Sequence, residues 1–140
     1  MTIREDFQFA QGSLQDYVEC RRRFELRYLL NLSWPAEPAE PAEVYEQHTA
    51  DGAAFHHRVH QREVGVPADA LPDPETGALP IWWQNYLEHK PRNLPAVHYP
   101  EISLSAEVAG YRLVAKYDLI AIEPGKQAVI VDWKTGQGRP

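Results

Sequence analysis

The last third of the chain changes from helical to strand-like spacing, and this change constrains the fold more than any other feature. Residues 101–108 alternate apolar and polar side chains, and residues 112–122 and 127–133 are rich in apolar and β-branched side chains. Tight turns are expected between these segments at Gly110-Tyr111 and Pro124-Gly125. The pattern predicts three strands in an antiparallel meander.

Helical spacing dominates the preceding part of the chain. A first helix is expected from Ser13, as N-cap, to about Asn31. Its predicted buried face consists of Leu14, Tyr17, Val18, Phe24, Tyr28 and Leu32. A second helix is expected over 43–63, or from Asp51 if that residue is the N-cap, and a third over 81–89. The predicted class is α/β (α+β-like), with N-terminal helices packed on the three-strand meander.

Length and composition indicate one domain in a chain of 140 residues and 16.0 kDa. Residues 34–43 repeat Pro-Ala-Glu and are expected to form an extended connector. Because the chain stops directly after the third predicted strand, we expect the domain to be C-terminally incomplete. A single cysteine, Cys20, excludes an internal disulfide, and no apolar run suits a membrane span. A cytoplasmic protein is expected.

The charge balance argues against a passive nucleic-acid-binding module. The formal net charge is −6, whereas binding to phosphates by electrostatics alone requires a basic surface. An acidic balance is compatible with a metal-dependent enzyme, because divalent cations neutralise its carboxylates.

Two aspartates are predicted to face each other across neighbouring strands. With the turn centred near residue 125, Asp118 and Asp132 come out almost opposite one another. Such carboxylates repel unless a cation binds between them, and oxygen ligands suit Mg²⁺ or Mn²⁺. Lys134 follows two residues later on the same strand face, where it can stabilise an oxyanion, neutralise a phosphate or help deprotonate water. The alternative is that these residues are solvated charges near strand ends.

Four segments match, in order, the motifs of a known group of nucleases. Residues 13–24 resemble an opening helix with the pattern Ser-x-x-x-Tyr-x-x-Cys-Pro-x-(Arg/Lys)-Phe, and Gly52-Ala53-Ala54-Phe55-His56 resembles a Gly-x-x-x-His motif. Ala115-Lys116-Tyr117-Asp118 keeps the aspartate of Gly-Arg-Ile-Asp, and Asp132-Trp133-Lys134-Thr135-Gly136 has Trp133 where Tyr is common. The chain thereby resembles the PD-(D/E)XK nuclease superfamily, in its RecB-type branch, which is related to CRISPR-associated exonucleases.

The resemblance implies a set of site residues. Its metal ligands for Mg²⁺ or Mn²⁺ are His56, Asp118, Asp132, Trp133 through its backbone carbonyl, and Glu101 as a further carboxylate. The catalytic residues that it implies are Asp118, Asp132 and Lys134. Some members also hold an iron–sulfur cluster, for which Cys20 matches the first position. The three partner cysteines are missing, so no cluster forms within these residues.

The function expected from the resemblance is a metal-dependent deoxyribonuclease, exonucleolytic, in DNA repair, phage or CRISPR-type processing. The Gln-x-x-x-Tyr helix that normally follows the last motif is not in the sequence, which leaves open whether these residues alone cut DNA. The alternative is a non-catalytic nucleic-acid or protein interaction module that retains the fold. A second copy or a partner protein that completes the sheet is a further possibility.

Two other clusters are candidates for contacts with DNA. Arg21, Arg22 and Arg23 are candidate phosphate contacts, although a solvated helix face is the favoured interpretation. Trp82, Trp83 and Tyr86 are able to stack on bases, but packing in a core or lid is favoured.

Overall fold

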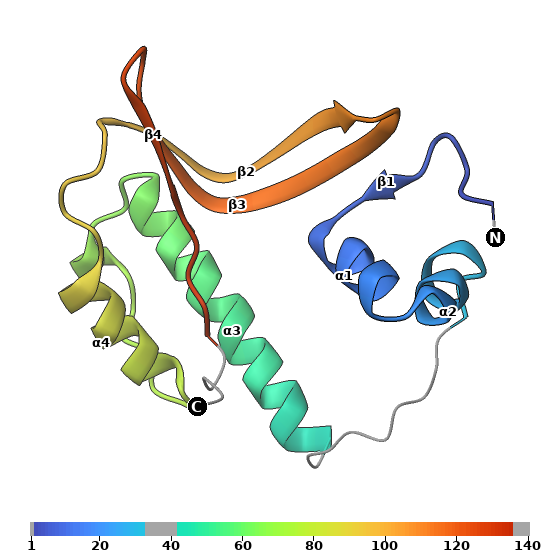
Figure 1. Ribbon diagram of the computed structural model, residues 1–140. Coiled ribbons are helices and arrows are strands. Elements are labelled where there is room, and N and C mark those ends of the chain that lie inside the picture. Colours follow the sequence, from blue (N-terminus) through green and yellow to red (C-terminus); the bar gives the residue numbers. More distant parts are fainter. Residues whose placement is uncertain (1, 33–41, 136–140) are drawn as a thin grey trace. The chain divides into compact units, whose positions relative to one another are not determined.

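The computed structural model describes residues 2–32 and 42–135 of the chain (Figure 1). They form two compact units: the first holds the residues before position 38 together with 103–116, and the second holds the rest. The predicted connector lies mainly outside the described residues, and its last two positions, Ala42 and Glu43, already belong to a helix. Among the described helices, none has both the length and the apolar character needed to cross a membrane.

The strands form a mixed sheet in which β3 pairs with the other three. Strands β2 (Val97–Val108) and β3 (Tyr111–Glu123) flank the turn Ala109-Gly110. Both turn residues have positive φ, 52° and 80°, as a type I′ hairpin turn requires, so the turn begins one residue earlier than predicted. Strand β4 (Gln127–Val131) pairs antiparallel with β3. The predicted α/β class and antiparallel meander are confirmed.

A fourth strand was not predicted. Strand β1 (Gln8–Phe9) lies parallel to β3 in the first unit, with Gln8 opposite Arg112 and Phe9 opposite Leu113. Two residues are too few for the alternation of side chains that identifies a strand in a sequence.

The single N-terminal helix expected over residues 13–31 is wrong. The first unit instead contains α1 (Gln11–Glu19), α2 (Arg21–Phe24) and a π-helical turn, η1 (Glu25–Leu29). The break falls at Cys20, whose backbone is extended with φ −157° and ψ 100°. Ser13 is not the N-cap: it lies inside α1, and its hydroxyl bonds to the backbone of Ala10, which precedes the helix.

The buried face predicted for that helix is wrong in part. Val18 is 81% exposed, whereas Phe24 is fully buried. Phe24 is the centre of an aromatic cluster in the first unit, and its ring centroid lies 5.3–5.9 Å from those of four other rings, within the range of favourable aromatic pairs. These neighbours are Phe7, Phe9, Tyr17 and Tyr28.

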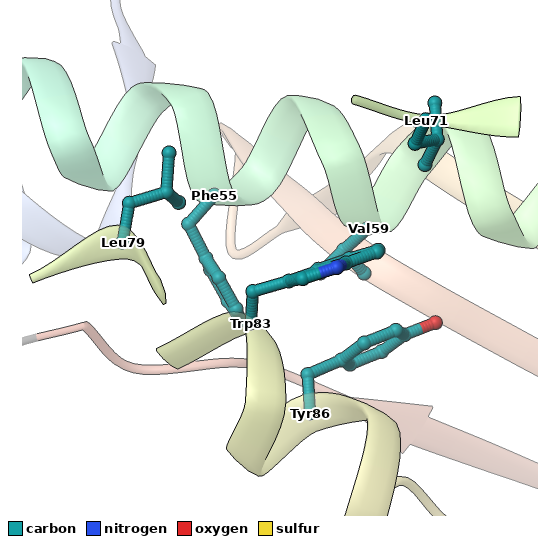
Figure 2. Close-up of a cluster of buried hydrophobic side chains, with 6 residues drawn as sticks. All are labelled: Phe55, Val59, Leu71, Leu79, Trp83 and Tyr86. Atoms are coloured by element: carbon teal, nitrogen blue, oxygen red, sulfur yellow. The ribbon is translucent and has the colours of Figure 1, made fainter. Parts of the chain in front are cut away.

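Two helices supply most of the core of the second unit. Helix α3 (Ala42–Glu63) and helix α4 (Leu79–His89) lie side by side, and the short 3-10 turn η2 (Ala68–Ala70) lies between them in the chain (Figure 1). Their buried side chains form one hydrophobic cluster with Leu71, which follows η2 (Figure 2): Phe55, Val59, Leu71, Leu79, Trp83 and Tyr86. Each fully buried side chain of this size contributes about 1.5–3 kcal/mol to folding.

Asp51 connects the two helices and is not an N-cap of α3. Helix α3 begins nine residues earlier, at Ala42, so Asp51 lies in its interior. Its buried carboxylate accepts hydrogen bonds from the backbone N–H of Ala78 at 2.9 Å and from the side-chain amide of Gln47 at 2.7 Å. Ala78 immediately precedes α4, so Asp51 fixes the start of α4 against α3.

Gly77 allows the backbone to approach Asp51. A Cβ atom at this position would lie 2.0 Å from Asp51 Oδ2, and the residue has a φ of 65°. Gly125 has a similar φ of 76°, but a Cβ there would meet no atom within 4 Å.

We expect Gly77→Ala to destabilise the protein more than the control Gly125→Ala. Both variants bear the cost of alanine at positive φ, about 1–2 kcal/mol, but only Gly77→Ala displaces the buried carboxylate. The additional loss should be about 1–3 kcal/mol, the cost of an unsatisfied buried polar group. Urea unfolding of both variants measures the difference. Equal losses at the two positions would contradict the role assigned to Asp51.

Candidate metal centre

Three side chains from different elements converge in the second unit. His56 lies on α3, Glu101 on β2 and Asp118 on β3. One ligand atom from each lies within 4.8 Å of the other two, and all three residues are half-buried. His56 Nδ1 lies 3.3 Å from Asp118 Oδ1. The structure therefore brings together three of the five predicted metal ligands.

Glu101 reaches this cluster through an unusual backbone conformation. Its φ is 54°, although it lies inside a strand and is not glycine. Upstream of it, exposed and half-buried residues alternate along β2, but Pro100, Glu101 and Ile102 are all half-buried. The left-handed residue therefore interrupts the alternation at this point. Such a conformation costs about 1–3 kcal/mol and is concentrated at functional sites in proteins.

Both carboxylate oxygens of Asp118 have a partner. While Oδ1 faces His56, Oδ2 accepts a hydrogen bond of 2.8 Å from the backbone N–H of Trp133. This bond ties the segment after β4 to β3. For Trp133 the structure thus gives a role to its backbone N–H, and coordination by its carbonyl stays a prediction.

Asp132 lies apart from the three-residue cluster. The predicted register is correct, since Leu119 pairs with Val131 and the next positions are Asp118 and Asp132. Strand β4 ends at Val131, however, and the Asp132 carboxylate lies 2.7 Å from Lys134 Nζ. It is not among the ligand atoms that lie within 4.8 Å of one another. A cation shared by both aspartates stays a prediction.

Lys134 is exposed and carries its charge close to the cluster. Its side chain is 79% exposed. The hydrogen bond with Asp132 and the negative charges of Asp132 and Asp118 raise the pKa of Lys134. Of the three roles expected for this lysine, the two that need an ammonium group are therefore favoured over removal of a proton from water.

Gly52 gives the segment after β4 room beside α3. A Cβ atom at Gly52 would lie 3.2 Å from Thr135 Oγ1, closer than ordinary van der Waals contact. The glycine of the second motif therefore contacts the threonine of the last motif. His56 lies one helical turn further along α3 from Gly52, so both residues face the same side of the helix.

The arginine cluster is largely engaged in local ion pairs of the first unit. Arg22 Nη1 lies 2.6 Å from Glu25 Oε2, and Arg23 pairs with both Glu19 and Asp16. These pairs agree with the solvated helix face favoured for Arg21, Arg22 and Arg23, and a contact of the three with DNA stays a prediction.

Asp16 has a role that the sequence did not reveal. It is buried and also pairs with Arg27 at 2.9 Å, and the hydrogen bond from Arg27 together with the charge of Arg23 lowers the pKa of Asp16. The signal in the sequence is the spacing, because Arg23 and Arg27 follow Asp16 by seven and eleven residues. This spacing alone does not predict the ion pairs, because the helix breaks at Cys20 between these residues.

The aromatic residues of α4 pack as expected. Trp83 and Tyr86 belong to the core, with exposures of 5% and 4%, and their rings stack at a centroid distance of 5.3 Å. Trp82 is half-buried and packs against the edge of this core.

The donor set fits a divalent cation. One imidazole and two carboxylates suit Mn²⁺ and Mg²⁺, which accept nitrogen and oxygen ligands. Ligands of one ion with bonds of about 2.0–2.5 Å lie at most roughly 4–5 Å apart. The separations in this cluster, up to 4.8 Å, fall at the upper end of that range.

One of three comparisons with known proteins gave a match. The sequence profile of the PD-(D/E)XK nuclease superfamily matches residues 68–140, slightly more than half of the chain. The matched segment includes Glu101, Asp118, Asp132 and Lys134. The comparison with curated proteins and that with solved structures each found no significant match.

The chain belongs to the PD-(D/E)XK nuclease superfamily, and the resemblance stated from its motifs is confirmed at that level. Membership indicates a metal-dependent nuclease in general. The RecB-type branch stays a prediction.

At position 101, glycine should give a more stable protein than alanine, the reverse of the usual order within a strand. At φ 54° we expect Glu101→Gly to be more stable than Glu101→Ala by about 1–2 kcal/mol, because only alanine has a Cβ that opposes this conformation. At Ser105, an exposed residue of the same strand without a positive φ, the alanine variant should be the more stable one. Chemical denaturation of the four variants measures both rankings. A preference for alanine at position 101 would contradict the strained conformation.

Metal binding should depend on His56 and not on its neighbour. Mn²⁺ at about 100 times its Kd should stabilise the wild-type protein by about 2.7 kcal/mol, visible as a higher Tm. We expect His56→Ala and Asp118→Asn to lose most of this shift. His57→Ala is the matched control, since His57 is exposed and lies about 100° around the helix. A full shift in His56→Ala would exclude this residue as a ligand.

Proposed function

We propose that the second unit of this chain carries the metal centre of a deoxyribonuclease that hydrolyses phosphodiester bonds. The observation that carries the proposal is the convergence of His56, Glu101 and Asp118 within 4.8 Å, in a chain that belongs to a nuclease superfamily. When bound, a divalent cation supplies Lewis-acid activation of water and neutralises charge at the phosphate.

The chain's own residues position the reacting groups. Asp118 orients the centre, because its carboxylate faces His56 on one side and holds the Trp133 backbone on the other. That backbone bond places the following residue, Lys134, beside the cluster. The exposed ammonium of Lys134 is accessible to a phosphate oxygen, where it would stabilise the negative charge that develops during hydrolysis.

Asp132 has two roles in this proposal. In the structure it accepts the Lys134 ammonium and thereby holds it near the centre. On binding of a phosphate, Lys134 would exchange this carboxylate for a phosphate oxygen, which frees Asp132 to serve as a further metal ligand. Exonucleolytic action and a place in DNA repair, phage or CRISPR-type processing are the expectations that the RecB-type resemblance adds.

One observation favours a second function, a non-catalytic interaction module with this fold. Asp132 and Lys134 neutralise each other at 2.7 Å, outside the three-residue cluster. In a module without catalysis, this pair would be a permanent surface ion pair. Binding of Mn²⁺ together with metal-dependent cleavage of DNA excludes the module. Binding of metal or DNA without any cleavage would support it.

Cleavage should require both members of the Asp132–Lys134 pair. We expect Lys134→Ala to lower the rate of Mg²⁺- or Mn²⁺-dependent DNA cleavage by about 100-fold or more, the effect of removing a group that stabilises developing negative charge. Asp132→Ala should also lower this rate, because its carboxylate holds Lys134 and serves as a further metal ligand in the proposal. Lys126→Ala is the control, since this exposed lysine pairs with Glu123 at the β3–β4 turn and lies outside the centre. Cleavage is followed with end-labelled DNA. Undiminished cleavage by the Lys134→Ala variant would exclude the role proposed for this lysine.

A further inference from the structure

A cavity of about 200 Å³ lies in the second unit beside the candidate metal centre. Its aromatic wall comes from Phe55 on α3, Trp82 and Tyr86 on α4, and Trp133 after β4. The Phe55 and Tyr86 rings, which come from the two helices, lie edge to face at a centroid distance of 6.3 Å. The Tyr86 and Trp133 rings contact edge to face at a centroid distance of 5.7 Å. Drug-sized ligands occupy roughly 300–1,000 Å³, so this cavity suits a smaller planar group.

Two cationic side chains, Lys90 and Lys134, line the cavity together with the polar side chains of Asn85, His89 and Thr135, and none of the described residues that line it is acidic. The Lys134 ammonium is also paired with Asp132 outside this lining. The Lys90 ammonium lies 5.7 Å from the centroid of the Tyr86 ring, at the aromatic wall. The chain as a whole has a net charge of −6, so a cavity lined by lysines and by no acidic residue differs from the overall charge of the protein. Aromatic rings with cations at the rim complement a ligand that is planar and anionic, as a nucleotide is.

Trp133 connects this cavity to the metal centre. Its backbone N–H donates to Asp118, while its side chain lines the cavity. Lys134 and Thr135 continue the lining from the same segment. A phosphate bound by Lys134 would therefore lie directly beside this cavity.

We propose that this cavity is a nucleobase subsite, which holds one unpaired base next to the scissile phosphate. The proposal rests on the proposed nuclease function and specifies its substrate. A base that enters a pocket has left the duplex stack, which costs least where the strand is already single. The substrate class that fits is therefore single-stranded DNA or an unpaired strand end.

The first test compares base-bearing and abasic strands. Binding of a short single-stranded oligonucleotide is measured in EDTA, where no metal-dependent cleavage occurs, by quenching of tryptophan fluorescence and by anisotropy of a label on the DNA. The wild-type protein should bind this strand roughly 5- to 150-fold more tightly than an abasic strand of the same length, since stacking of one base on an aromatic side chain is worth about 1–3 kcal/mol. It should also bind the strand more tightly than its blunt duplex. Equal affinity for the base-bearing and abasic strands would overturn the subsite.

The second test uses variants of the cavity. Trp82→Leu should lower the affinity for the base-bearing strand toward that for the abasic strand and leave the abasic affinity unchanged. Tyr99→Leu, at an exposed aromatic residue of β2, is its control. A folded Trp82→Leu protein with an undiminished preference for the base-bearing strand would overturn the proposal.

A pair of surface variants tests the subsite without altering buried packing. Asn85 lines the cavity and Gln84 does not, although both are exposed on α4. Asn85→Glu and Gln84→Glu change the net charge equally, so a general electrostatic effect weakens binding equally in both. The subsite predicts a several-fold loss in Asn85→Glu alone, and equal losses would contradict it.

The binding and cleavage experiments distinguish a failure of the subsite proposal from a failure of the proposed nuclease function. If the protein prefers base-bearing strands in EDTA but cleaves no DNA with Mg²⁺ or Mn²⁺, the result supports the subsite and contradicts the proposed nuclease function. If the protein cleaves DNA but binds base-bearing and abasic strands equally, the result supports the nuclease function and contradicts the subsite.

Discussion

The carboxylate of Asp118 is the interaction on which the rest of the site depends. Its two oxygens face two different elements, His56 on α3 and the Trp133 backbone after β4. A half-buried carboxylate with a donor on one oxygen and an imidazole on the other has little freedom to rotate. The same group therefore holds the fold together locally and orients the chemistry, so the two roles are not independent. Any change at this position alters both the folded state and the centre.

The parts of the fold that follow from local chemistry were predicted from the sequence. The β3–β4 register follows from the position of Gly125 and from the apolar strands on either side, and it places Leu119 opposite Val131 as expected. The helix over 81–89 is present and begins two residues earlier, with Pro80 in its first turn, where a missing N–H costs nothing. His56 and Asp118 were assigned from separate motifs, and the structure brings them together.

The parts that were not predicted depend on tertiary contacts or on single backbone angles. The break at Cys20 lies in a stretch with continuous helical spacing, and the contacts around Phe24 and Asp16 favour two shorter helices over a straight one. The positive φ of Glu101 has no sequence signal, because glutamate is not one of the residues enriched in that conformation. The ion pair between Asp132 and Lys134 was missed, since their shared strand face also permits separate roles.

One stretch of α3 illustrates how closely fold and site are joined. Asp51 holds the start of α4, Gly52 admits the segment after β4, Phe55 fills the core and His56 enters the metal centre. These residues occupy two adjacent turns, and each faces a different neighbour. Since each added residue rotates the helix by about 100°, a single insertion within 51–56 would misdirect the residues on one side of it relative to those on the other. This stretch should therefore tolerate no change in length, so that during evolution the spacing between Asp51, Gly52, Phe55 and His56 would persist together with their side chains.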